Sequence, residues 1–342
     1  MFSVLGHNNA VDLLKRSLEK GSVAHAYLFV GPAHVGKMTL AVNLAQALNC
    51  ESPDRPCGKC PSCLRITGGK HADIQVIELE VGGESGESGK TRISVEQVDA
   101  ILHSVNLPPF EGKHKVFIIA GADAMSIGAA NRLLKTLEEP ISRVVFILLT
   151  ANESLVPATV ISRCQRVELF PLPASQIEND LIANRGVEPK KASLLSRLSA
   201  GCPGWAITMV QNDALLQQRT EWLDEWLEIM DADIDRRFTF VAKFVDKFSQ
   251  NRETVYQKLN LLLDWWHDLL LVRTGNAEGI TNVDREDALR QISASYTVAK
   301  IRRFIKSIQS VQEQLRQNVN PQLAMEVLML NVPENGKVRV SN

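Results

Sequence analysis

The segment GPAHVGKMT has the spacing of a phosphate-binding loop but lacks one of its functional side chains. In the pattern G-x-x-x-x-G-K-[ST], glycines let backbone N–H groups surround phosphates, the lysine reaches the outer phosphates, and the hydroxyl holds Mg²⁺. Gly31, Gly36 and Lys37 are present, but Met38 takes the hydroxyl position and Thr39 follows one residue late. One residue turns a side chain by about 100° around a helix. We therefore expect a nucleotide cradle that uses the metal poorly.

Four cysteines follow within fourteen residues at the spacing C-x6-C-x2-C-x2-C: Cys50, Cys57, Cys60 and Cys63. Two consecutive C-x-x-C steps bring thiolates around one ion, and the prolines and glycine between them allow tight turns. A site of four cysteines has no open coordination position, so the predicted ion is a structural Zn²⁺. Four thiolates alone leave an iron–sulfur cluster as an alternative, and four unrelated cysteines as another.

The run KVFIIAGADAM predicts a strand and the residues that follow it. At the carboxyl end of such a strand, a nucleotide hydrolase carries acidic residues that orient Mg²⁺ and polarise water. Ala120 and Gly121 occupy that place, and the first carboxylate is Asp123. Because Asp123 comes three residues past the useful position, we expect it to cap the following helix. The base for hydrolysis is therefore missing, independently of Met38.

Arg163 lies in ISRCQRVEL, between a serine and a cysteine and before an apolar run. An exposed guanidinium at such a position can reach a phosphate in a neighbouring subunit. A single arginine is more often an ordinary surface or ion-pair residue. The segment ANRLLKTLEEP, residues 130 to 140, precedes it and has the pattern of an amphipathic core helix ended by Pro140.

The elements that must position these residues alternate apolar, β-rich runs with helical stretches. The runs are AYLFV (26–30), DIQVIEL (73–79), KVFII (115–119) and VVFILLT (144–150). This alternation predicts a parallel sheet covered by helices on both faces. Leu40, Leu44 and Leu48 recur every four residues after the first run, so the phosphate-binding loop is expected to open onto a helix.

Beyond the sheet the chain reads as helical, and prolines in FPLP at 170–173 predict a domain boundary. The expected divisions are an α/β domain at 1–169 with the cysteine module at 50–63, a small helical unit at 170–210, a helical domain at 211–332 and a disordered tail at 333–342. The glycine- and serine-rich segment 80–90 is expected to be a mobile loop. Trp222, Trp226, Trp265 and Trp266 have helical spacing that favours core over interface positions.

Composition excludes several classes of protein. With a net charge of -1 over 342 residues, no global field draws the chain to nucleic acid or an acidic membrane, so any DNA contact needs a local patch or a partner. The start lacks signal-peptide features, and the apolar run at 144–149 is too short to span a bilayer. We expect a cytoplasmic protein without a membrane partner, in which cysteines bind metal or pack in cores.

Taken in chain order, HAYLFVGP, the cysteine cluster, ANRLLKTLEEP and ISRCQ resemble the delta-prime and gamma/tau clamp-loader subunits of bacterial DNA polymerase III. The likeness covers roughly residues 1 to 210, and the helical remainder matches in length and character. It implies an AAA+ domain with a zinc module, a helical lid at 170–210, and a C-terminal collar domain that joins other subunits. It also implies that Arg163, in the S-R-C motif, serves in trans as an arginine finger for ATP on an adjacent subunit.

Three departures from the motor-subunit pattern favour the delta-prime type. Met38 replaces a serine or threonine, Ala120 and Gly121 replace an acidic pair, and Trp205 replaces the arginine of a G-x-P-G-R pattern in the lid. All three remove ATP chemistry while Arg163 remains. The resemblance then implies a subunit that is no enzyme on its own and belongs to the DNA polymerase III holoenzyme. Binding of ATP or ADP at the altered loop stays open.

The implied partners are the gamma/tau and delta subunits and, through the complex, the beta sliding clamp and primer-template DNA. One alternative is an active gamma/tau-type ATPase, in which Thr39 or a water replaces the missing hydroxyl. Another is a zinc-bearing nucleic-acid adaptor that acts without a clamp loader. The cysteine region offers it Arg55, Lys59 and Arg65 but no aromatic residue for base stacking.

Overall fold

The computed structural model describes residues 2–78, 92–317 and 319–333, and the chain divides into two compact units. The first unit comprises Met1–Asp180 and Gly201–Trp205, and the second comprises Leu181–Ala200 and Ala206–Asn342. The loop predicted at 80–90 and the tail predicted at 333–342, apart from Pro333, lie outside the described residues. The division into domains at 1–169, 170–210 and 211–332 therefore stays a prediction, because the structure divides the chain into two units rather than three.

A five-stranded parallel sheet with the strand order β2-β3-β4-β1-β5 forms the centre of the first unit. Its strands are β1 (Ala26–Val30), β2 (Ile74–Ile77), β3 (Lys115–Ala120), β4 (Val144–Thr150) and β5 (Gln165–Glu168). Every residue of β4 is buried, as expected of a central parallel strand with both faces covered. The predicted parallel α/β architecture is confirmed.

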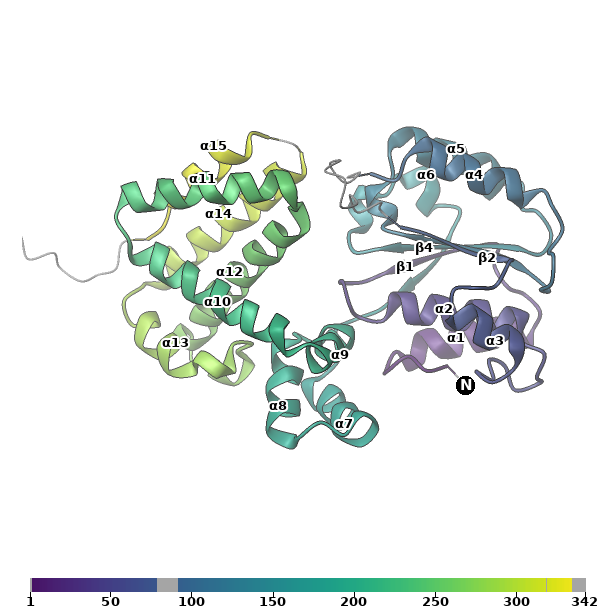
Figure 1. The fold of residues 1–342 in the computed structure, drawn as a ribbon, viewed down its shortest axis with the longest axis horizontal. Coiled ribbons are helices and arrows are strands. Elements are labelled where there is room, and N and C mark those ends of the chain that lie inside the picture. The colour runs from purple at the N-terminus through teal and green to yellow at the C-terminus, as the bar shows by residue number, and fades with distance from the viewer. Residues whose placement is uncertain (1, 79–91, 318, 334–342) are drawn as a thin grey trace, which may run out of the picture. The chain divides into compact units, whose positions relative to one another are not determined.

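Helices cover both faces of this sheet, with α1, α2 and α3 on one side and α4, α5 and α6 on the other (Figure 1). The elements are α1 (Asn8–Glu19), α2 (Lys37–Asn49), α3 (Pro61–Thr67), α4 (Val95–Val105), η1 (Ala122–Ala124), α5 (Ile127–Glu138), η2 (Glu153–Leu155) and α6 (Ala158–Ile161). Side chains alternate along the strands, so Phe29 packs with Leu44 in one core while Phe146 packs with Leu133 in the other.

The strand register brings the loops that follow β1, β3 and β4 to one edge of the sheet. Val30 pairs with Thr150, and Ala120 pairs with Leu149, so these strands end side by side. In an open parallel sheet, ligands bind beyond the carboxyl ends of the strands. The phosphate-binding loop lies at this edge.

The second unit is helical and has its own core. The helices in and around it are α7 (Ala174–Arg185), α8 (Pro189–Leu198), α9 (Pro203–Gln211), α10 (Asp213–Asp231), α11 (Ile234–Gln250), α12 (Arg252–Arg273), η3 (Ala277–Gly279), η4 (Val283–Arg285), α13 (Glu286–Ser293), α14 (Val298–Arg316) and α15 (Pro321–Leu330). Trp226, Trp265 and Trp266 are fully buried in this core, and Trp222 packs against it. The preference for core positions is confirmed for Trp226, Trp265 and Trp266, whereas Trp222 is only half-buried. Among the helices that the structure describes, none has the length and apolar character of a membrane span.

Candidate functional site: an altered phosphate-binding loop, a cysteine cluster and an exposed arginine

The phosphate-binding loop runs from the end of β1 to the start of α2, and its two glycines are required by backbone geometry. The Gly31 N–H donates to the Thr150 carbonyl at 3.2 Å, and a Cβ at residue 31 would lie 2.3 Å from the Leu169 carbonyl oxygen. Gly36, the N-cap of α2, has φ 116°, a backbone conformation that favours glycine. Both glycines therefore shape the backbone of the loop.

Lys37 Nζ donates to two carbonyl oxygens of the same loop, Gly31 at 2.5 Å and Pro32 at 2.7 Å. Burial lowers the pKa of Lys37, and the charges of Asp123 and Cys202 act in the opposite direction. The lysine that would contact outer phosphates is thus half-buried and bound to the loop itself.

Two other segments of the first unit contact the same loop. The Gly204 N–H donates to the His34 carbonyl at 2.9 Å, and a Cβ at residue 204 would approach that oxygen to 2.8 Å. From the amino-terminal side, His7 Nε2 lies 3.0 Å from the Val35 carbonyl oxygen. The G-C-P-G-W segment and the start of the chain therefore both hold the loop backbone.

The two residues after Lys37 differ in their surroundings. Met38 is half-buried and packs against the core that α1 and α2 form with the sheet. Thr39, the nearest hydroxyl, is exposed. The structure thus gathers Gly31, Gly36 and Lys37 in one loop and leaves a thioether at the position where the pattern has a metal-binding hydroxyl.

The prediction that Asp123 caps the helix after β3 is wrong. Ser126 caps α5, since its hydroxyl accepts the Ala129 N–H at 3.1 Å. Gly121, at φ 91°, turns the chain into η1. Asp123 lies within η1, a separate turn that ends before α5 begins. The negative charge of the Asp123 carboxylate instead acts to raise the pKa of Lys37. Ala120 and Gly121 leave the carboxyl end of β3 without a carboxylate.

The four predicted cysteines come together. Their sulfur atoms all lie within 4.8 Å of one another, with Cys50 and Cys60 at 4.0 Å and Cys57 and Cys63 at 4.0 Å. A tetrahedral Zn²⁺ with bonds of about 2.3 Å separates its sulfur ligands by about 3.8 Å. The donor set and its spacing therefore fit one structural ion.

Local backbone geometry explains how the cysteine cluster forms. Cys57 Sγ accepts the N–H groups of Lys59 (3.4 Å) and Cys60 (3.3 Å), and these bonds lower the pKa of Cys57 to about 6. Cys60 caps α3, with Pro61 at the first helical position. Because the thiolate is the form that binds metal, donation to Cys57 Sγ favours the ligand state.

Polar residues that the sequence pattern did not single out join this cluster to the sheet domain; Gln46 and Asn49 are buried, and Lys113 is exposed. Gln46 Nε2 donates to the Cys63 carbonyl at 3.0 Å, and Lys113 Nζ donates to the Cys50 carbonyl at 2.7 Å. Asn49 Oδ1 accepts the N–H groups of Lys113 and His114, at 2.8 and 2.9 Å. The leucine repeat of α2 gave no signal for them, because their partners lie far away in the sequence.

Arg163 follows α6 and is 33% exposed. Its Nη1 donates to the Thr159 carbonyl at 2.8 Å and to Ser162 Oγ at 3.1 Å, and its Nη2 donates to Glu138 Oε1 at 2.6 Å. Glu138 ends α5, the helix predicted from ANRLLKTLEEP. The sequence placed Glu138 correctly in that helix but gave no signal of its pairing with Arg163.

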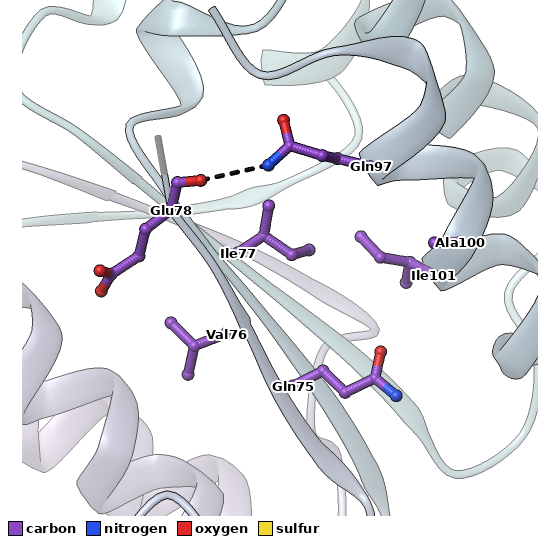
Figure 2. A pocket seen from close by; sticks show the side chains of 7 residues that line it. All are labelled: Gln75, Val76, Ile77, Glu78, Gln97, Ala100 and Ile101. Atoms are coloured by element: carbon purple, nitrogen blue, oxygen red, sulfur yellow. Dashed lines mark hydrogen bonds between the residues drawn. The ribbon is translucent and has the colours of Figure 1, made fainter. Parts of the chain in front are cut away.

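A separate depression lies at the β2 edge of the sheet and holds none of these residues (Figure 2). It is lined by Gln75, Val76, Ile77, Glu78, Gln97, Ala100 and Ile101. Gln97 Nε2 donates to the Glu78 carbonyl at 3.3 Å, and its Oε1 accepts the Ser94 N–H at the start of α4. With Glu78 as its one titratable side chain, this lining offers no paired groups for acid–base chemistry.

Comparison with known proteins gives the family. A family model described as DNA polymerase III, delta subunit, matches residues 6–173, and one described as DNA polymerase III, delta subunit, C terminal, matches residues 213–334. DNA polymerase III subunit delta' of Bacillus subtilis is 30% identical over 325 residues, which are 95% of this chain and 95% of the relative. The delta' subunit of Pseudomonas aeruginosa is 28% identical over 90% of this chain and 91% of its own.

A tau subunit is also similar. DNA polymerase III subunit tau of Bacillus subtilis is 26% identical over 96% of this chain, which spans 60% of that relative's length. The delta' relatives, by contrast, match along nearly their whole length. The chain belongs to the clamp-loader delta-prime family of DNA polymerase III subunits.

Proposed function

We propose that this chain is a non-hydrolysing clamp-loader subunit that helps a complex with gamma/tau and delta subunits place the beta sliding clamp on primed DNA. In that complex Arg163 serves in trans as an arginine finger for ATP bound to a gamma/tau neighbour. The observation that carries the proposal is a contrast within the sheet domain. Arg163 is half-buried, with its side chain 33% exposed and with donors to spare, whereas Met38, Ala120 and Gly121 take the positions of metal-binding and water-polarising groups.

The loop geometry supports the absence of hydrolysis in this subunit. Phosphoryl transfer needs a metal ion at the β- and γ-phosphates and a group that orients the attacking water. Met38 packs in the core beside α2, and the carboxyl end of β3 carries no carboxylate. Bound ATP or ADP would also have to draw the Lys37 ammonium away from the Gly31 and Pro32 carbonyls.

The cysteine cluster supports a structural role for Zn²⁺ in the proposed subunit. Cys50, Cys57, Cys60 and Cys63 would hold the ion, and a four-thiolate site offers no open position for a substrate. The bonds from Gln46 and Lys113 would then fix the zinc module to α2 and to the segment before β3.

One observation favours an active gamma/tau-type ATPase as a second candidate. The charge of Asp123 acts on Lys37, so a carboxylate does lie near the phosphate-binding loop. Phosphate release by the isolated chain, measured with malachite green, separates the two functions. The proposed subunit releases no phosphate above the Lys37→Ala control, whereas turnover that disappears in that control supports the ATPase.

The finger is tested in a complex reconstituted with gamma/tau and delta subunits. Arg163→Ala should lower DNA-stimulated ATP hydrolysis at the neighbouring site, because an arginine finger contributes about 10³ to 10⁵ in rate. Arg166→Ala is the matched control, since that exposed arginine pairs with Glu153 at 2.7 Å within its own chain. Equal hydrolysis and clamp loading by Arg163→Ala and Arg166→Ala complexes would exclude the finger role.

A further inference from the structure

Among the described residues, the Glu138 carboxylate is the one hydrogen-bond partner of the Arg163 guanidinium that comes from outside the α6 turn. Thr159 and Ser162 belong to the same turn as Arg163, whereas Glu138 comes from the end of α5, 25 residues earlier. The Nη2 to Oε1 distance of 2.6 Å is that of a short, charge-assisted hydrogen bond. The bond to Glu138 therefore ties the Arg163 guanidinium to α5, and so to the sheet domain.

This pair contributes little to folding. Both side chains are accessible, at 33% for Arg163 and 50% for Glu138. Accessible ion pairs of this kind stabilise a fold only weakly, since solvent screens the attraction and side-chain entropy opposes it. In addition, Glu138 and Glu139 are both negative at the C-terminal end of α5, where the helix dipole disfavours anions. Stability alone does not explain a carboxylate at this position.

The pair has a clear effect on orientation. A free arginine side chain samples many rotamers, and each hydrogen bond to a fixed partner reduces the conformations that it samples. A guanidinium has five N–H donors. The bonds to Thr159 and Ser162 use the two donors on Nη1, and the bond to Glu138 uses one of the two donors on Nη2. Among the described residues, no hydrogen-bond partner takes the Nε donor or the second Nη2 donor. Donors on these two nitrogens can pair with the oxygens of a phosphate.

We propose that Glu138 is a positioning residue for Arg163, which fixes the guanidinium so that its remaining donors meet the γ-phosphate on the neighbouring subunit. This inference rests on the trans role proposed for Arg163. Catalysis by a phosphate-binding arginine depends on its placement, and a misplacement of about 1 Å can lower a rate by about 10²-fold. Glu138 touches neither substrate nor metal in this scheme and acts through the position of Arg163.

The test uses complexes with delta and with gamma/tau subunits whose own S-R-C arginine is replaced by alanine, so that Arg163 is the finger under measurement. Glu138→Ala should lower kcat for DNA-stimulated ATP hydrolysis by about tenfold with KM for ATP unchanged, because the neighbour still binds the nucleotide. Glu138→Gln should recover most of that loss, since its amide oxygen still accepts the Nη2 hydrogen bond. Glu139→Ala, the adjacent exposed carboxylate, is the matched control and should match the unmodified chain.

The outcomes separate this inference from the proposed function. If Arg163→Ala leaves hydrolysis unchanged, the finger role itself is wrong. If Arg163→Ala lowers kcat while Glu138→Ala equals Glu139→Ala, the finger stands and the positioning role is wrong. A rise in kcat for Glu138→Ala also contradicts positioning, because it would mean that the carboxylate masks the guanidinium. Circular dichroism and the mass of each complex verify that the variants fold and assemble.

Discussion

The Asp73 carboxylate anchors the segment that precedes β3, and we predict that Asp73→Asn opens this segment about a hundredfold more often. Asp73 is 2% exposed. Its Oδ1 accepts the Phe110 N–H at 2.7 Å, and its Oδ2 accepts those of Glu111 and Gly112 at 2.9 and 2.7 Å. An asparagine keeps one acceptor and places an N–H₂ donor at the other oxygen position, where backbone donors already point.

The magnitude follows from the bonds lost. A hydrogen bond to a charged group contributes about 1.5 to 3 kcal/mol, and a buried donor left without a partner adds a desolvation cost. Two such bonds are lost at Oδ2, and water recovers part of the difference because Glu111, one of the two donors, is an exposed residue. The net loss is about 3 kcal/mol, and each 1.36 kcal/mol is a factor of ten in an equilibrium constant. The opening constant therefore rises by about 10².

Hydrogen exchange of the full chain at pH 7, read by mass spectrometry on a peptide that contains residues 110–112, measures this opening directly. Asp99→Asn is the control, since that exposed carboxylate on α4 makes one long ion pair with Arg132 at 3.7 Å. Exchange in this peptide should speed up by about 10² in Asp73→Asn and stay unchanged in Asp99→Asn. Equal exchange in the two variants would refute the role assigned to the Asp73 carboxylate.

Three further predictions concern the metal, pH and the helical core. Replacing Cys57 and Cys60 together by serine should reduce bound zinc from about one ion per chain to almost none by elemental analysis, whereas Cys202→Ser should retain it; equal zinc in both variants would contradict the four-cysteine site. Burial opposes the charge of Asp73, but three backbone N–H bonds outweigh it and hold its pKa below the usual value. The stabilising effect of the Asp73 carboxylate is therefore complete above the unfolded pKa of about 3.9 and is lost as pH falls through the lower folded pKa. Protection of residues 110–112 from hydrogen exchange, corrected for intrinsic exchange, should persist at pH 5. Loss of this protection at pH 5 would contradict the lowered pKa. Leu259→Ala, at a fully buried position, should lower the free energy of unfolding of the helical unit by about 2 to 5 kcal/mol in urea followed by tryptophan fluorescence, and the exposed Leu323→Ala by less than about 0.5 kcal/mol.

Local sequence patterns were sufficient for the features that depend on nearby residues. The glycine spacing of the phosphate-binding loop reflects local backbone geometry, and the loop does open onto a helix, α2, with Gly36 as its N-cap. The cysteine spacing likewise reflects turns over a few residues, and the four sulfur atoms do lie together. Trp226 and Trp265 have the helical spacing of core residues and are buried.

Contacts between distant segments could not be read from local patterns. Asn49 and Lys113 are 64 residues apart, and Glu138 and Arg163 are 25 apart, so no short window contains either pair. The error at Asp123 has another origin. Asp123 and Ser126 are both good N-cap residues, and the choice between them depended on the turn that Gly121 makes before η1, which residue types alone did not indicate.

The mass of the intact assembly tests the central claim most directly. The chain should be co-purified with gamma/tau and delta subunits of the same organism and the product weighed by native mass spectrometry. If this chain is a clamp-loader subunit, we expect one stable complex whose mass includes this chain together with both partners. A chain that elutes alone as a monomer in the presence of both partners would contradict the account.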